Sequence, residues 1–94
     1  MSARTAESLA ILDRLLPLLE TLPAGQDRDE LLEEAQALRR AVAAFHMEAI
    51  RFRMYAVDRL IRRADDPAET RTTFEALRDA LERAGFHTRS HAAP

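Results

Sequence analysis

Apolar residues recur at helical spacing in three parts of the chain, and they predict helices at about 6–22, 28–64 and 67–84. In the first segment Leu and Ile residues cover about half of a helical wheel, and Thr5 is placed to act as the N-cap. Pro17 lies inside this pattern, so we expect a kink or break near Leu16. Residues 22–26 contain Pro and Gly and predict a loop.

The second segment predicts one long helix. Asp27 and Glu30 have the spacing of a capping box, and no Gly or Pro follows until Pro67. A continuous helix over 28–64 would be roughly 55 Å long at 1.5 Å per residue. Its apolar positions step by four and three residues, as in a coiled coil, and predict a dimer or core seam that includes Leu31, Ala35, Leu38, Val42, Phe45, Ala49, Phe52 and Ala56.

A second apolar seam begins near the middle of this helix. It lies about 140° from the first on the helical wheel and comprises Ala43, Met47, Ile50, Met54, Val57 and Ile61. Two seams require two packing partners. The narrow polar strip that is left includes Glu48, Arg51, Tyr55, Asp58, Arg59 and Arg62.

The third helix has signals at both ends. Asp66 fits an N-cap, Pro67 the first helical position and Glu69 a second capping box. Gly85 fits the left-handed position that ends a helix, with Phe86 following it. We therefore predict a single helical domain over 1–86 and a flexible tail over 87–94.

Short loops make consecutive helices antiparallel, so the two flanking helices should each cover less than half of the long one. The uncovered apolar side predicts an antiparallel dimeric helical bundle, a homodimer. Charge favours this orientation, because the acidic residues between 27 and 34 would lie over Arg59, Arg62 and Arg63 of the mate. The two-fold axis would then pass near His46.

Composition narrows the class of protein. With 47% hydrophobic and 32% charged residues, the chain is too apolar for disorder and too charged for a membrane span. The absence of Cys excludes disulfides, thiolate zinc sites and iron–sulfur clusters. No leader-like apolar stretch follows the N-terminus, since Asp13 and Arg14 interrupt the first apolar run, and we expect a cytoplasmic protein.

His46 and Arg53 are the candidate ligand-binding residues. They fall between the two apolar seams, seven residues apart on one face. A guanidinium there needs an anionic partner. One hypothesis is an internal ion-pair network with Asp13, Glu20, an acid of the third helix or a residue of the mate. A second is a polar pocket near the dimer axis that binds a small anion or a metal. A third is that these side chains reach water at the edge of the bundle.

Other chemistry has less support in the sequence. There is no E-x-x-H pair for a di-iron site, and the i,i+4 pair His87 and His91 falls in the predicted tail. No serine has a nucleophile-elbow context, so we expect no catalytic residue, no metal site and no cofactor. Nucleic acid is disfavoured by the net charge of −2 and the isoelectric point near 5.9.

The sequence thus predicts a non-enzymatic interaction, scaffold or regulatory module that dimerises through its long helix and binds a partner protein. The partner surface would include Arg51, Tyr55, Arg59 and Arg62. The alternative is a ligand- or metal-binding sensor bundle with its pocket at His46 and Arg53.

Overall fold

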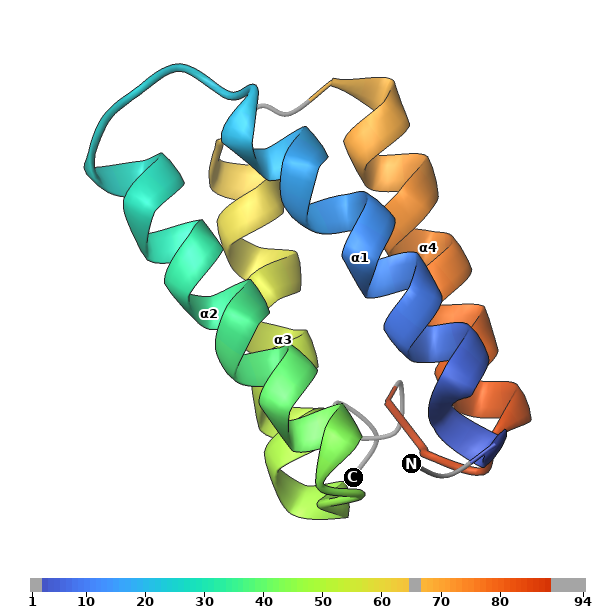
Figure 1. The fold of residues 1–94 in the computed structure, drawn as a ribbon. Helices are drawn as coiled ribbons and strands as arrows, with labels where there is room; N and C mark the ends of the chain where they lie inside the picture. Colours follow the sequence, from blue (N-terminus) through green and yellow to red (C-terminus); the bar gives the residue numbers. More distant parts are fainter. Residues whose placement is uncertain (1–2, 65–66, 89–94) are drawn as a thin grey trace.

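The computed structural model describes residues 3–64 and 67–88. Within these ranges the chain forms a short 3-10 turn, η1 (Ala3–Thr5), and four helices with no strand, so the all-α prediction is confirmed (Figure 1). The helices are α1 (Ala6–Glu20), α2 (Gln26–Ala43), α3 (Met47–Arg63) and α4 (Ala68–Arg83). The predicted count of three is wrong, because the segment 28–64 is not one helix but two.

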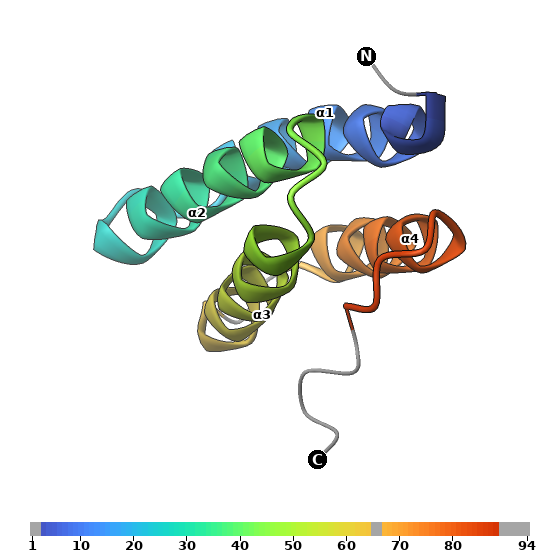
Figure 2. The same ribbon diagram turned by 90° about the horizontal axis from the view of Figure 1, so that it is seen from below.

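The four helices are arranged in two layers. Seen end-on, α1 and α2 form one layer and α3 and α4 the other (Figure 2). The closest packing is of α2 against α3 and of α1 against both α4 and α2. The last helix therefore packs mainly against α1, whereas the sequence placed it along the second half of a long helix. The radius of gyration is 12.4 Å, close to the roughly 13 Å of a compact 100-residue domain. The longest extent is 33 Å, which is too short for the roughly 55 Å helix predicted over 28–64.

The long helix is interrupted at Ala44, Phe45 and His46. Phe45 has a positive φ of 61° and occupies the left-handed position of a Schellman motif. Its backbone N–H donates to the Val42 carbonyl at 3.0 Å, and the His46 N–H donates to the Ala41 carbonyl at 3.0 Å. The chain then turns back, so that α3 runs antiparallel to α2 (Figure 1).

Aromatic contacts hold Phe45 in this conformation. The rings of Phe45 and Phe86 meet edge to face, with centroids 5.1 Å apart and an interplanar angle of 72°. The Arg4 guanidinium lies 5.1 Å from the Phe45 centroid and 5.6 Å from the Phe86 centroid. A left-handed non-glycine residue costs about 1–2 kcal/mol. An aromatic pair contributes about 0.5–1.5 kcal/mol and a cation–π contact about 0.5–1 kcal/mol, which offsets most of that cost.

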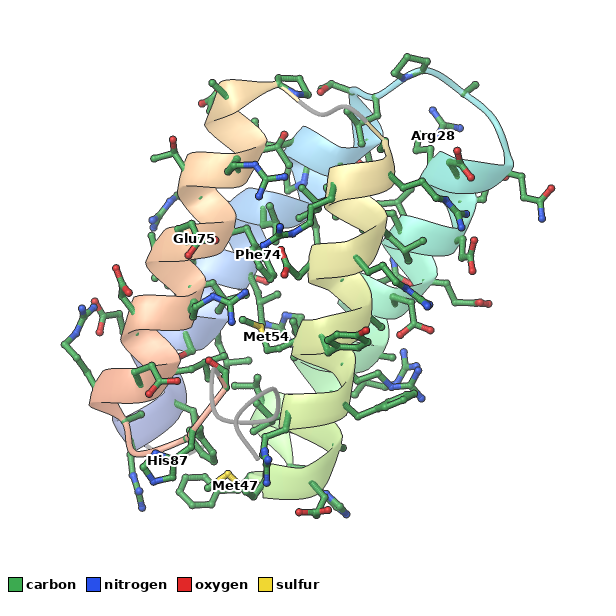
Figure 3. All side chains as sticks on the ribbon, turned by 180° about the vertical axis from the view of Figure 1, so that it is seen from behind. Arg28, Met47, Met54, Phe74, Glu75 and His87 are labelled. Carbon is green, nitrogen blue, oxygen red and sulfur yellow. The ribbon has the colours of Figure 1, made fainter. Side chains whose placement is uncertain are left out.

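The predicted seam does not form one continuous face, because the helix that carried it is broken. Leu38, Val42 and Ala56 are buried and Ala49 is half-buried. Phe45 and Phe52, in contrast, are 41% and 62% exposed. The core of α3 comes from the second seam, in which Ile50, Met54, Val57 and Ile61 are all buried. Figure 3 shows Met54 and Phe74 between α3 and α4.

The starts of α2 and α4 differ from the predicted ones, and the break expected in α1 does not occur. Helix α2 begins one residue after Gly25, whose φ is 156°, so Asp27 is not its N-cap and the capping box is not formed. Pro17 neither ends nor breaks α1, which continues to Glu20. Helix α4 begins at Ala68 with Pro67 as its N-cap, so Pro67 is not the first helical residue, and the predicted N-cap Asp66 lies outside the described residues.

The predicted end of α4 is confirmed. Gly85 has a φ of 97°, its N–H donates to the Glu82 carbonyl at 3.0 Å, and the Phe86 N–H donates to the Leu81 carbonyl at 2.9 Å. The chain stays packed for two residues more, because Thr88 is buried and donates to the Glu82 carboxylate at 2.7 Å through N–H and 2.9 Å through Oγ1. The rest of the predicted tail, 89–94, lies outside the described residues.

Candidate interaction surface on α3

Helix α3 has a second stripe of side chains opposite its buried one. Residues 48, 52, 55 and 59 step by four, three and four, so they follow one face of the helix. All four are exposed, and Arg51 beside them is half-buried. We call this set the α3 outer face: Glu48, Arg51, Phe52, Tyr55 and Arg59.

Two aromatic rings dominate the α3 outer face. Phe52 is 62% and Tyr55 47% exposed, and these two and Phe45 are the large apolar side chains that the described residues leave exposed. With Glu48 and Arg51 they line a shallow depression of about 250 Å³. A contiguous aromatic patch is unusual on a small monomer and marks a binding surface more often than a lone exposed side chain does.

Arginines flank both rings. The Arg53 guanidinium carbon lies 5.3 Å from the Phe52 centroid, and that of Arg59 lies 6.0 Å from the Tyr55 centroid. The single acid of the surface, Glu48, is 3.9 Å from the Arg51 guanidinium. Aromatic and arginine side chains are the types enriched in the centres of protein interfaces. The α3 outer face can therefore bind an apolar surface that carries negative charge.

Arg53 and His46, the predicted ligand-binding residues, each have a role within the chain. One Arg53 nitrogen donates to both carboxylate oxygens of Glu34 on α2, at 2.9 and 3.0 Å. His46 is exposed and caps α3, its Nδ1 accepting the Ala49 N–H at 3.2 Å. Arg53 thus belongs to an internal ion pair. Its partner, Glu34, is none of the acids that the ion-pair hypothesis named.

The predicted surface residue Arg62 belongs to a different group of charges, between α3 and α4. Its Nε donates to Asp58 at 3.2 Å, and this hydrogen bond raises the pKa of Arg62. The other Asp58 oxygen is 3.6 Å from Arg78 of α4, which also lies 3.4 Å from Glu75 (Figure 3). Arg62 is therefore at the edge of the surface rather than within it.

Arg78 is the buried charge that sequence reasoning missed. It is only 7% exposed, and its guanidinium carbon lies 5.3 Å from the Phe74 centroid. A signal was present, because position 78 lies four residues after Phe74 and three before Leu81, at the edge of the apolar stripe of α4. Arg78 joins α4 to α3 through Asp58.

A second hollow, of about 350 Å³, lies at the other end of the bundle between the α1–α2 loop and the end of α3. Its guanidinium groups are beside carboxylates. Arg63 lies 3.0 Å from Asp27, and Arg28, labelled in Figure 3, lies 3.7 Å from Asp29. Carboxylates of the chain therefore offset the positive charge around this hollow, so the hollow is poorly suited to bind an anion.

In the part of the chain that the structure describes, no three His, Asp or Glu side chains are grouped so that they could hold a metal ion. None of the helices in that part is both long and apolar enough to cross a membrane.

Comparisons with known proteins give no assignment: no family model, curated protein or solved structure matches this chain.

Proposed function

We propose that the chain is a small interaction module that binds a partner protein through the α3 outer face and has no chemistry of its own. The observation that carries the proposal is the pair of neighbouring exposed rings, Phe52 and Tyr55, on the side of α3 opposite its core. Burying such rings against a partner removes apolar area from water at about 25 cal/mol per Å².

The partner we propose presents an amphipathic helix with acidic residues beside its apolar stripe. The α3 outer face is a helical ridge with a shallow depression, which suits helix-on-helix recognition. Arg51 and Arg59 outnumber Glu48, so a negatively charged helix would be steered toward the surface. We place the module in the cytoplasm, where its partner would be scaffolded or regulated.

A homodimer paired through the seam predicted from the sequence would compete with such a partner, because Phe52 belongs both to that seam and to the α3 outer face. The sensor hypothesis, in contrast, needs a free guanidinium at its pocket, and Arg53 is held by Glu34. No observation in the described residues favours it.

The test compares baits that differ only on the surface. Wild type, the double variant Phe52→Ser/Tyr55→Ser and a control double variant Arg14→Ser/Glu20→Ser on exposed positions of α1 are used to isolate bound proteins from the source cells. We expect a protein recovered with wild type and the control and lost with the α3 variant. Raising the salt concentration should also weaken its binding.

Two results would overturn the proposal. Binding that survives the α3 double variant would place the interaction elsewhere. A wild-type dimer that the same variant converts to monomer would make a second copy, not an acidic partner, the occupant of this surface. Circular dichroism checks that all three proteins are folded, which we expect because the substituted side chains are exposed.

A further inference from the structure

The turn between α2 and α3 is a poor place for a helix to end. Ala44, Phe45 and His46 include no Gly or Pro, and Ala is the strongest helix former. Phe45 must adopt a positive φ, which a bulky side chain disfavours. The ends of α2 and α3 also leave carbonyls and N–H groups that a continuous helix would pair within itself.

The turn divides the chain into two halves that pack against each other. Helices α1 and α2 lie on one side of it in the sequence, and α3 and α4 on the other. The two halves are joined by the packing of α2 on α3 and of α1 on α4.

Ion pairs join the same two halves. Arg53 meets Glu34, Arg63 meets Asp27 at 3.0 Å, and Arg83 of α4 meets Glu7 of α1 at 2.7 Å. None of these contacts requires that the halves belong to the same chain.

We propose that the chain forms a domain-exchanged homodimer in which the α2–α3 turn straightens. Residues 26–63 become one continuous helix, and α1 and α2 of one copy pack against α3 and α4 of the other. The helix packing and the ion pairs between the halves are kept, now between chains, while the strain at Phe45 is removed twice. Short strained hinges favour this kind of exchange.

The pattern of the sequence agrees with this state. A helix without Gly or Pro, carrying two seams about 140° apart, suits a long helix whose two ends pack in two different bundles. Each bundle in the exchanged dimer has the core of the monomer. The monomer is favoured by dilution and by the contacts of Phe45 with Phe86 and Arg4, so the two states should be in a concentration-dependent equilibrium.

A matched pair of variants isolates the turn. Phe45→Ala and Phe45→Gly both delete the ring, but Ala favours the helix and Gly favours the left-handed turn. Because each dimer contains two hinges, we expect dimerisation of Phe45→Ala to be at least about 100-fold tighter than that of Phe45→Gly. Sedimentation velocity over a dilution series after refolding measures both dissociation constants.

A cross-linking experiment identifies the exchange itself. The chain has no Cys, so Asp27→Cys and Arg63→Cys are made in separate Phe45→Ala chains, which are mixed, unfolded, refolded and treated with a thiol-reactive cross-linker whose spacer is about as long as an Arg side chain. Exchange brings position 27 of one chain beside position 63 of the other and predicts a covalent heterodimer. The control pairs Glu7→Cys with Arg63→Cys, which lie at opposite ends of the bundle and should not link (Figure 1).

Equal dissociation constants for the Ala and Gly variants would overturn the proposal, since the turn would then not control association. So would two folded proteins that remain monomeric throughout the dilution series. A dimer in which positions 27 and 63 of different chains do not cross-link would be a surface dimer rather than an exchanged one.

Discussion

A guanidinium nitrogen of Arg63 lies 3.0 Å from a carboxylate oxygen of Asp27, although the two residues are 36 positions apart in the chain. The same nitrogen is 3.4 Å from Glu30. These contacts join the end of α3 to the beginning of α2, at the far end of the hairpin from Phe45. The fold thus brings the acidic start of the segment 27–63 onto its own basic end.

The Arg63–Asp27 pair should contribute little to stability by itself. Both side chains are more than half exposed, and exposed pairs contribute about 0–1 kcal/mol. We expect Arg63→Asp to lower the free energy of unfolding by about 1 kcal/mol, because it places a third acid beside Asp27 and Glu30. Adding Asp27→Arg should recover most of the loss, as measured by urea denaturation. No recovery in the double variant would show that the pair is not formed.

Arg53 and Glu34 should contribute more, because they are better shielded from water. The Glu34 side chain is only 22% exposed and accepts two hydrogen bonds. We expect Glu34→Gln to lower the free energy of unfolding by about 1–2 kcal/mol. Glu33→Gln, at an exposed neighbouring position, is the control and should change it by less than about 0.5 kcal/mol. Equal effects of the two variants would contradict this account of Arg53.

Arg78 should be the costliest of the arginines to truncate. Its side chain is 9% exposed and contacts Asp58, Glu75 and the Phe74 ring. We expect Arg78→Ala to lower the free energy of unfolding by about 2–3 kcal/mol, since both packing and one of the two arginine partners of Asp58 are lost. Arg78→Met keeps the packing and should lose less. A loss from Ala no greater than that from Met would mean that packing by the stem of Arg78 is unimportant.

The hydrogen bonds between Arg39 and Asp13 can be tested by titration at acidic pH. Hydrogen bonds from Arg39, at 2.8 and 3.2 Å, lower the pKa of this carboxyl in the folded chain. A lowered pKa stabilises the fold at pH values above the unfolded pKa, and that contribution is lost as pH falls through the folded pKa. In an NMR titration we expect the Asp13 midpoint to rise in Arg39→Gln and to stay unchanged in Arg14→Gln. A midpoint that Arg39→Gln leaves unchanged would rule out the hydrogen bond in solution.

Local signals were enough to predict much of the fold. The all-α class, the start of α1 after Thr5 and the motif at Gly85 follow from periodicity and from the preference of Gly for positive φ. The break at Phe45 could not be predicted in this way, because Ala44 favours the helix and a bulky residue such as Phe45 seldom adopts a positive φ. It depends on contacts with Arg4 and Phe86, which are distant in sequence.

The break at Phe45 also explains why Phe52 is exposed although the sequence assigned it to the seam. The sequence assigned Arg51, Tyr55 and Arg59 to the polar strip and Phe52 to the seam, but in the structure the four lie on one face of α3. Beyond residue 45 the first seam consists of Ala49, Phe52 and Ala56. The second seam has more large apolar side chains there: Ile50, Met54, Val57 and Ile61. Once α3 is free to rotate relative to α2, the richer seam enters the core and Phe52 is left outside.

Residues 26–63 fold back on themselves, and the outer face of α3 is left uncovered. The distance between spin labels on Asp27→Cys and Arg63→Cys within one chain tests this directly, in the monomeric fraction and diluted with unlabelled protein. We expect a short distance, because the Asp27 and Arg63 side chains are in contact. A distance near the roughly 54 Å that 36 residues span in a straight helix would contradict it.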